Sequence, residues 1–339
     1  MAAPVFSEPS DNAQSGQNWT NTVIVLVGPT GIGKTRVSLL LAQHLNAEII
    51  SADSMQIYRH MDIGTAKPTP QERSAVRHHM IDIAEPWQQY STGDYVSNVA
   101  PVIDGLHALG RIPLVVGGTG LYIRAMTRGI FNGPSADWDL RAALIEEDQA
   151  APGSLYARLR LLDAEAAERI SPADSRRIVR ALEVCLTADA RISEMRRDQT
   201  RPLPYRFIKI GLTRQRNELY RNIDERVDAM IREGLVAEVM AVSALVEQHF
   251  SEGGSAAPAR RTPPLPSMQA IGYKEIVSHL NGASGLEEAI RLIKKRSRNY
   301  AKRQFTWFRK ESGILWLDVT GISEPGPVVE RILAVLDRA

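Results

Sequence analysis

Val23-Ile-Val-Leu-Val27 runs directly into Gly28-Pro-Thr-Gly-Ile-Gly-Lys34-Thr35, and the apolar stretch that begins at Val37 follows at once. The spacing G-x-x-x-x-G-K-T between a β-branched strand and a helix predicts a phosphate-binding loop. Its small residues let backbone N–H groups surround a di- or triphosphate at a helix N-terminus. Lys34 would supply a counter-charge and Thr35 a hydroxyl ligand for Mg²⁺. The sequence therefore predicts a protein that binds a phosphorylated ligand.

A second apolar run, Ile112–Val116, predicts a neighbouring parallel strand of the same sheet, and it ends in Gly117-Gly-Thr-Gly-Leu-Tyr122. In a hydrolytic NTPase the corresponding strand commonly ends in Asp. Here the acid follows a different run instead, as Asp53 after Ala47–Ala52. An Asp at the carboxyl end of a strand lies on the rim where doubly wound sheets bind ligands. An Asx-turn or a helix N-cap is the alternative role for Asp53, and the sequence leaves both open.

Composition limits the class of protein. With 339 residues, 44% of them hydrophobic and 24% charged, the chain can bury a large core as two folding units or as one domain with an insertion. The lone Cys185 excludes an intramolecular disulfide and a cysteine zinc site, and it favours a reducing compartment. No apolar run reaches the ~20 residues that span a bilayer, and residues 1–20 contain no Lys or Arg. We expect a cytoplasmic protein with a disordered tail over residues 1–20 and no membrane partner.

The predicted fold is α/β, with a parallel sheet of the P-loop NTPase type, flanking helices and an inserted all-helical subdomain. Alternating strands and helices assign residues 21–132 and 205–339 to the core, which ends in basic helices. Helical periodicity assigns residues 133–204 to the insertion. We expect one long helix over residues 217–238, a flexible loop over 250–266, a last strand at 314–319 and a closing helix at 328–336.

Two basic runs favour a nucleic-acid partner, although the net charge is only +2. The first run has no acidic residue between Arg291 and Lys310 and interleaves Tyr300, Phe305, Trp307 and Phe308 among its cations. An amphipathic helix with solvated cations is its alternative. The second run lies within residues 133–204, and there salt-bridged helix faces explain the pattern equally well. It comprises Arg169, Arg176, Arg177, Arg180, Arg191, Arg196, Arg197 and Arg201.

The stretch Tyr58–Pro68 differs from an ordinary connector. It carries a Gly-Thr-Ala-Lys turn, in which we expect Lys67 to be a free cation, and a Pro that ends the turn. We expect this loop to lie over the ligand.

Several stretches, taken in order, resemble the tRNA dimethylallyltransferases, also called tRNA isopentenyltransferases. The resemblance covers nearly the whole chain outside the N-terminal tail and the loop before Ser267. The matching stretches are Gly28-Pro-Thr…Gly-Lys-Thr35, Asp53-Ser-Met-Gln-Ile-Tyr-Arg, Met61-Asp-Ile-Gly-Thr-Ala-Lys-Pro68, Gly117-Gly-Thr-Gly-Leu-Tyr122, Arg177-Ile-Val-Arg-Ala-Leu-Glu, Gln269-Ala-Ile-Gly-Tyr-Lys and Ala301-Lys-Arg-Gln.

The resemblance implies a reaction. The dimethylallyl group of dimethylallyl diphosphate passes to N6 of adenosine 37, just 3′ of the anticodon, in tRNAs that read codons starting with U. Because the N6 lone pair is delocalised into the purine, attack benefits from a carboxylate that accepts the amine proton, and we expect Asp53 to be that base. Diphosphate is the leaving group, so ATP should not be consumed. The base must leave its stack, in a channel between the core and the inserted helices.

The resemblance also implies the site residues. Asp53, Thr35 and Arg226 would be catalytic, with Thr35 as the Mg²⁺ ligand. The diphosphate would bind Gly28, Pro29, Thr30, Gly31, Ile32, Gly33, Lys34, Thr35 and Arg226. The anticodon stem-loop of tRNA would contact Asp53, Ser54, Met55, Gln56, Thr119, Arg176, Arg177, Ile178, Val179, Arg180, Gln269, Ala270, Ile271, Gly272, Tyr273 and Lys274. A bacterial-type enzyme is expected, because the C-terminus carries no Cys/His zinc finger. We also expect a monomer.

Other functions remain open at this point. They are an adenylate isopentenyltransferase that uses free adenine nucleotides, a P-loop kinase of small metabolites, and an RNA-binding protein with a vestigial loop. One departure from the family bears on the diphosphate site. Asn222 stands where the family usually has Arg, and the sequence does not say whether the adjacent Arg221 compensates.

Overall fold

The computed structural model describes residues 19–131, 133–252 and 265–338. The predicted tail over residues 1–20 lies outside the described residues except for residues 19 and 20. Of the predicted flexible loop over residues 250–266, residues 253–264 lie outside the described residues, and residues 250–252 are the end of a helix, which corrects that boundary.

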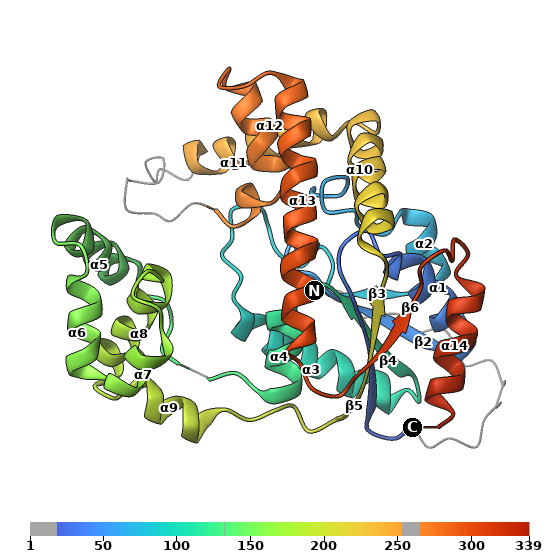
Figure 1. Cartoon of the computed structure of the whole chain (residues 1–339), viewed down its shortest axis with the longest axis horizontal. Coiled ribbons are helices and arrows are strands. Elements are labelled where there is room, and N and C mark those ends of the chain that lie inside the picture. The colour runs from blue at the N-terminus through green and yellow to red at the C-terminus, as the bar shows by residue number, and fades with distance from the viewer. Residues whose placement is uncertain (1–18, 132, 253–264, 339) are drawn as a thin grey trace.

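A parallel six-stranded sheet organises the core, in the order β3-β2-β4-β1-β5-β6 (Figure 1). Every neighbouring pair runs parallel. The β-branched run of the sequence forms the buried strand β1, at a central position of the sheet. The predicted α/β fold with a parallel sheet is thus confirmed. The strands are β1 (Thr22–Val27), β2 (Ala47–Ala52), β3 (His78–His79), β4 (Ile112–Gly117), β5 (Arg206–Thr213) and β6 (Ile314–Asp318).

Helices cover both faces of the sheet, because side chains of each strand point alternately to either side. Ile24 and Leu26 of β1 belong to the core packed by α1 (Lys34–Leu45) and α14 (Gly326–Leu336). Val23, Val25 and Val27 belong to the opposite core, packed by α3 (Thr92–Ala108) and α4 (Gly120–Arg128). The short helix α2 (Pro70–Ala75) precedes the edge strand β3.

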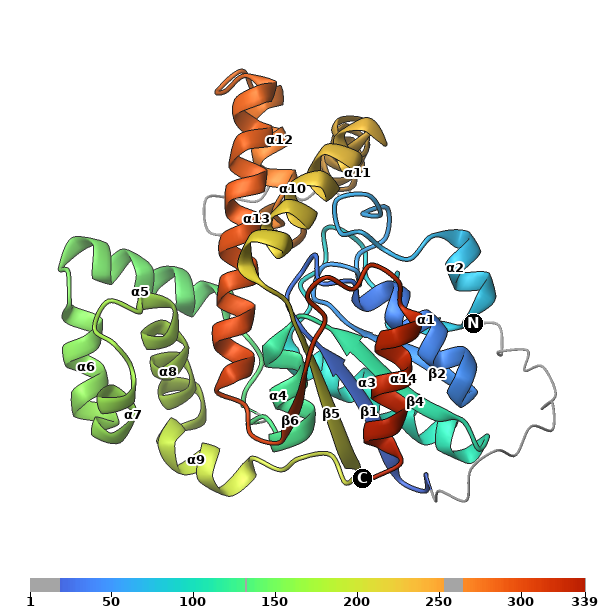
Figure 2. The same cartoon turned by 45° about the vertical axis from the view of Figure 1, so that its right-hand side comes forward.

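A third core lies beyond the carboxyl ends of the strands, among α10 (Arg216–Arg232), α11 (Leu235–Glu252), α12 (Tyr273–Leu280) and α13 (Leu286–Arg309) (Figure 2). A 3₁₀ turn, η1 (Ser267–Gln269), leads into α12. The single helix predicted over residues 217–238 is wrong, because the chain breaks between α10 and α11. Gly234 lies there with φ at 102°, a left-handed conformation that ends a helix.

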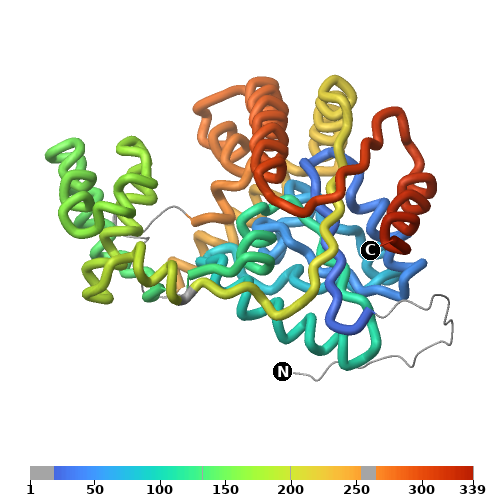
Figure 3. Tube along the Cα trace, turned by 60° about the horizontal axis from the view of Figure 1, so that its bottom comes forward, coloured from blue at the N-terminus to red at the C-terminus, as the bar shows by residue number. Residues whose placement is uncertain are grey.

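Helices α5 to α9 pack around a core of their own and stand apart from the sheet (Figure 3). Two chain segments connect them to the core, and these segments meet in an antiparallel bridge between Ile130 and Arg201. These are the residues predicted as an inserted helical subdomain. The helices are α5 (Trp138–Ala150), α6 (Ser154–Leu162), α7 (Ala164–Arg169), α8 (Ser175–Ala188) and α9 (Ile192–Gln199). None of the helices in the described residues is long and apolar enough to cross a membrane.

Three glycines at the end of β4 and in the turn after it are required, because atoms of other elements lie where a Cβ would stand. A Cβ on Gly117 would lie 2.1 Å from the carbonyl oxygen of Ala52 on β2. A Cβ on Gly118 would lie 2.2 Å from the Gln304 amide, and one on Gly120 would lie 2.2 Å from the Trp307 ring. Helix α13 thus packs directly on the turn between β4 and α4, at the carboxyl edge of the sheet.

Replacing Gly117 by alanine should lower the free energy of unfolding by about 1–3 kcal/mol, since a backbone atom of β2 would have to move. Chemical denaturation measures the change. Gly105→Ala is the control, because Gly105 lies in helix α3 with no atom within 4 Å of the added Cβ. We expect the control to be neutral or stabilising by up to about 1 kcal/mol. Equal stability of the two variants would contradict the close packing.

Candidate active site

A cavity of about 270 Å³ lies at the carboxyl edge of the sheet, above the phosphate-binding loop. Elements far apart in the sequence form its walls. Thr30 and Thr35 come from the loop and α1, Asp53 follows β2, Arg226 comes from α10, and Tyr300 comes from α13. A parallel sheet brings strand ends and following loops together at one edge, which is why these residues meet.

The loop adopts the conformation that an anion site needs. Gly31 and Gly33 have φ values of 77° and 100°, which glycine adopts without strain. Gly33 precedes α1, whose first turn contains no acidic residue. The positive end of the helix dipole is therefore available to a bound diphosphate.

Lys34 and Arg226 place two cations at this cavity. The Lys34 ammonium donates hydrogen bonds to the carbonyl oxygens of Gly28 (2.8 Å) and Pro29 (3.0 Å). Arg226 donates to the Thr30 hydroxyl at 3.2 Å. Burial lowers the pKa of Lys34 to about 8; the neighbouring Asp53 opposes this shift and Arg226 adds to it. Burial also lowers the pKa of Arg226, again opposed by Asp53. A bound diphosphate would relieve the repulsion between the two cations.

The lowered pKa of Lys34 predicts a pH-dependent affinity for an alkyl diphosphate. The charged ammonium attracts the anion, so affinity should be full below pH 8 and should fall as the pH rises through 8, by up to about tenfold per unit. Equilibrium binding between pH 7 and pH 10 measures this. The control is Lys34→Arg, whose guanidinium stays charged and should flatten the profile. Identical slopes for the two proteins would contradict the assignment.

Asp53 directly follows β2, lines the cavity and forms the Asx-turn that the sequence left open as its alternative role. Its Oδ1 accepts a hydrogen bond from the Met55 backbone N–H at 2.9 Å, which forms an Asx-turn. Its Oδ2 has no hydrogen bond to any residue that the structure describes. The Asx-turn fixes the carboxylate while one oxygen stays available at the cavity.

Thr119 joins the Asp53 turn to the glycine-rich turn after β4. Its hydroxyl oxygen accepts a hydrogen bond from the Ser54 N–H at 3.0 Å and lies 3.3 Å from the Ser54 hydroxyl. Its own N–H donates to the Ala52 carbonyl at 3.1 Å. Thr119 thus fixes the residue that follows Asp53, while Asp53 itself lines the cavity.

Two site residues, Tyr300 and Gln304, were missed by the sequence reasoning. Both line the cavity, one turn apart on α13. Gln304 is buried, accepts a hydrogen bond from the Thr30 N–H at 2.8 Å and donates one to the Gly118 carbonyl at 2.9 Å. Burial, with the nearby Asp53, raises the pKa of Tyr300. The stretch Ala301-Lys-Arg-Gln supported the resemblance, but the sequence reasoning assigned no role to Gln304.

Some residues predicted to contact tRNA are core residues. Ile178 and Val179 are buried inside the α5–α9 core, and Ala270 and Tyr273 are buried in the third core. Because these four side chains are buried, they are not accessible to a tRNA in this structure, which corrects the prediction that they contact it through their side chains. The exposed members of the same stretches are Arg176, Arg177 and Gln269, while Ile271 and Lys274 are partly exposed. Arg180 is held by Glu183 and by the Pro134 carbonyl.

The expectation that Lys67 is a free cation is wrong. Its side chain is 1% exposed, and its ammonium donates to the Tyr58 carbonyl (2.5 Å), Asp62 (2.8 Å) and Asp82 (2.5 Å). The lysine holds the loop together from inside. Thr65, Ala66 and Pro68 nonetheless line the cavity, so the loop lies beside it, and its position over a ligand stays a prediction.

Many cations of the two basic runs have acidic partners, some distant in the sequence and some within one helical turn. Lys294, Arg296 and Arg298 of α13 pair with Asp228, Glu275 and Asp224. Among the inserted helices, the paired cations include Arg169, Arg177, Arg191 and Arg197. The amphipathic alternative therefore holds for the first half of α13. Lys302 and Arg303 in its second half, and Lys310 just after its end, are exposed and form no ion pair with a described residue.

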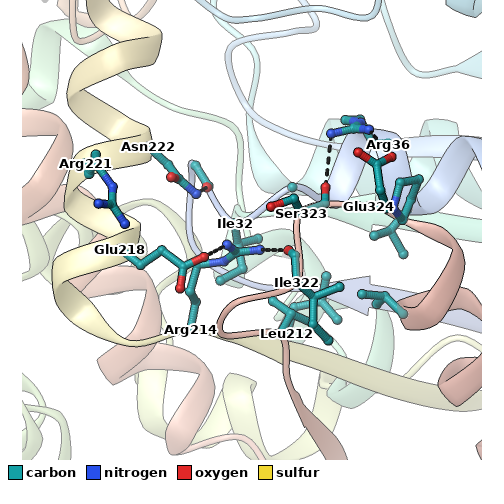
Figure 4. A pocket seen from close by; sticks show the side chains of 16 residues that line it. Ile32, Arg36, Leu212, Arg214, Glu218, Arg221, Asn222, Ile322, Ser323 and Glu324 are labelled. Carbon is teal, nitrogen blue, oxygen red and sulfur yellow. Dashed lines mark hydrogen bonds and ion pairs between the residues drawn. The ribbon is translucent and has the colours of Figure 1, made fainter.

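A second cavity of about 380 Å³ lies on the other side of Gly31 and Gly33. Figure 4 shows Arg221 there, near Glu218 and Asn222, while Arg36 is bonded to Ser323 and Glu324. Asn222 borders both cavities, and Arg221 borders only this second one. Arg221 therefore lies outside the first cavity, which Asn222 borders.

Comparisons with known proteins agree on one family. The family model described as IPP transferase matches residues 56–311. A tRNA dimethylallyltransferase of Thermodesulfovibrio yellowstonii is 52% identical over 93% of this chain and 97% of its own length. One of Symbiobacterium thermophilum is 45% identical over 93% and 94%.

Solved structures give the same result for the fold. The full-length tRNA isopentenylpyrophosphate transferase of Bacillus halodurans is 38% identical, with a TM-score of 0.64, over 94% of this chain and 97% of that one. A eukaryotic dimethylallyltransferase acting on tRNA is 29% identical, with a TM-score of 0.75, over 94% and 79%.

Proposed function

The chain belongs to the tRNA dimethylallyltransferase family, and from that premise we propose that it transfers the dimethylallyl group of dimethylallyl diphosphate to N6 of adenosine 37 in tRNA. The products are N6-(dimethylallyl)adenosine and diphosphate. One observation carries the proposal. A single cavity joins a phosphate-binding loop and two cations, Lys34 and Arg226, to a carboxylate with an available oxygen, Asp53. The strand end at Gly117 offers no acid for hydrolysis.

The diphosphate end of the cavity would stabilise the leaving group. As the bond between C1 of the allyl group and the diphosphate oxygen breaks, its electron pair stays on that oxygen. Backbone N–H groups of the loop, the N-terminus of α1, Lys34 and Arg226 would receive the developing charge. Gln304 keeps the Thr30 N–H in a fixed place, so the loop is already arranged before the donor binds.

The opposite wall would receive the amine. The N6 lone pair forms the new bond to C1, and the N6 proton passes to Oδ2 of Asp53. The Asx-turn to Met55 holds the carboxylate during this step. Tyr300, which lines the same cavity, offers an aromatic surface beside the five-carbon group.

We propose Thr35 as the protein ligand of a Mg²⁺ ion. No cluster of three or more His, Cys, Asp or Glu side chains in the described residues is arranged to hold a metal. That fits Mg²⁺, which is often held by one or two protein oxygens together with substrate phosphates and water. When bound, the ion neutralises diphosphate charge.

We infer that the anticodon stem-loop docks between the core and helices α5 to α9. Arg176 of α8 and Lys302 and Arg303 of α13 are exposed and form no ion pair with a described residue, while the exposed Arg177 pairs with Asp174. Such cations contribute phosphate contacts. Adenosine 37 would be flipped toward Ser54 and Thr119, and the enzyme would act as a monomer.

Labelled dimethylallyl diphosphate with tRNA or AMP as the acceptor, together with a separate assay that supplies ATP, tests the proposal. We expect label in tRNA, none in AMP, and no phosphoryl transfer when ATP is supplied with any acceptor. Label in AMP alone would support an adenylate isopentenyltransferase. ATP-dependent phosphorylation without prenyl transfer would support a metabolite kinase.

A further inference from the structure

Two motifs have no role in the chemistry above, namely the Met61–Pro68 loop and the segment from Gln269 to Lys274. The loop forms one wall of the donor cavity through Thr65, Ala66 and Pro68. On the inner side, the Gln56 amide donates to the carbonyl oxygens of Thr65 (3.3 Å) and Ala66 (3.2 Å). Gln56 and Lys67 thus hold this wall from the inner side of the loop, and contacts on the outer side hold it as well.

Glu238 of α11 holds the loop from outside. Its Oε2 accepts hydrogen bonds from the backbone N–H groups of Asp62 (2.8 Å) and Ile63 (2.7 Å). Its Oε1 accepts one from the Gly64 N–H at 2.9 Å. Three successive N–H groups form a concave anion site, and here a carboxylate of the protein itself fills it.

Tyr273 connects Glu238 to the segment predicted to contact tRNA. Its hydroxyl donates to Oε1 of Glu238 at 2.5 Å, and burial together with Glu238 raises its pKa. Its ring lies against Gly64, where an added Cβ would be 2.5 Å from a ring carbon. Tyr273 is the first residue of α12, so the exposed Gln269 and the partly exposed Lys274 are its near neighbours.

We propose that Glu238 and Tyr273 are positioning residues of the transfer reaction. They fix the loop wall of the donor cavity, and they link it mechanically to the segment 269–274 on the tRNA side. The inference rests on the proposed function. The route has three links: the Tyr273 hydroxyl to Glu238, Glu238 to the N–H groups of residues 62–64, and this turn to Thr65 and Ala66 at the cavity.

Tyr273→Phe removes only the hydroxyl and keeps the ring on Gly64. We expect the KM for dimethylallyl diphosphate to rise about tenfold, the effect of one hydrogen bond to a charged group. The Kd for tRNA should change by less than twofold. Glu238→Gln turns an acceptor into a donor that faces a backbone N–H, so its effect should be larger. The double variant should be no worse than Glu238→Gln, because both residues act through one contact.

Tyr205→Phe is the matched control. The Tyr205 hydroxyl also donates to a carboxylate, Asp104, at 2.6 Å, but it lies before β5, at the end of the sheet away from the cavity. We expect Tyr205→Phe to lower stability and to leave the donor KM unchanged. Donor KM values that match for Tyr273→Phe and Tyr205→Phe would overturn the proposal. So would weaker tRNA binding by Tyr273→Phe at an unchanged donor KM, since the residue would then act at the RNA surface.

Failure of this inference differs from failure of the proposed function. If the wild-type enzyme leaves tRNA unmodified, the proposed function is wrong. Equilibrium binding of dimethylallyl diphosphate in the absence of tRNA then still tests the loop. Weaker binding by Glu238→Gln, but not by Tyr205→Phe, supports the positioning role, and equal binding by both variants overturns it.

Discussion

Asp53→Asn should reduce the rate of transfer to tRNA by about 10²–10⁴-fold, the range that a lost general base commonly produces. The amide still offers an oxygen to the Met55 N–H, so the Asx-turn is retained. It no longer accepts the N6 proton. Single-turnover transfer measures the rate, while filter binding measures tRNA affinity, which should stay within about twofold.

Asp337→Asn provides the control for this prediction. Asp337 is an exposed residue at the end of α14, remote in sequence from every site residue, and its substitution should leave the rate unchanged. A rate for Asp53→Asn close to that of the wild type would remove the carboxylate from the role of base. A large loss of tRNA affinity would instead assign Asp53 to binding.

Arg226→Ala should lower kcat/KM for dimethylallyl diphosphate by about 10²–10³-fold, the scale of one lost contact to a developing oxyanion. Arg226 borders the cavity with Lys34 and donates to Thr30. Without Arg226, Lys34 is the remaining Lys or Arg side chain among the described residues that line the cavity. Steady-state kinetics with varied donor and saturating tRNA measure the effect. Arg226→Lys should recover part of the activity, because the charge is kept while the planar fork is lost.

Arg221→Ala is the matched control on the same helix. Arg221 is also an arginine of α10, but it borders the second cavity and not the donor cavity. We expect its donor kinetics to stay within about twofold of the wild type. If Arg221→Ala and Arg226→Ala lose donor kcat/KM equally, a general loss of positive charge explains the effect. The assignment of Arg226 to the diphosphate would then be wrong.

Local sequence patterns were enough to predict the diphosphate end of the site. The loop from Gly28 to Thr35 carries its own geometry, because glycine spacing and the strand–helix context determine where its N–H groups point. Asp53 was found by its place after an apolar run. Arg226 lay near an apolar face by helical periodicity, but its role came only from the resemblance.

Contacts between distant elements were not predictable from local patterns. Gln304 reaches a loop 274 positions away. The stretch that ends at Gln304 supported the resemblance, but no local pattern identified its partner. Lys67 was expected to be free, but its acidic partners include Asp82, which lies in another loop. The acidic partners of α13 lie mostly on α10 and α12, so the absence of acids within the basic run was misleading.

The central claim is that one cavity holds the departing diphosphate and the carboxylate that deprotonates the purine amine. Its most direct test is mass spectrometry of nucleosides and mapped fragments of tRNA after incubation with dimethylallyl diphosphate and Mg²⁺, without ATP. The account predicts N6-(dimethylallyl)adenosine confined to the position 3′ of the anticodon, with one diphosphate released for each modified tRNA. Unmodified anticodon-loop adenosines, or a reaction that depends on ATP, would contradict it.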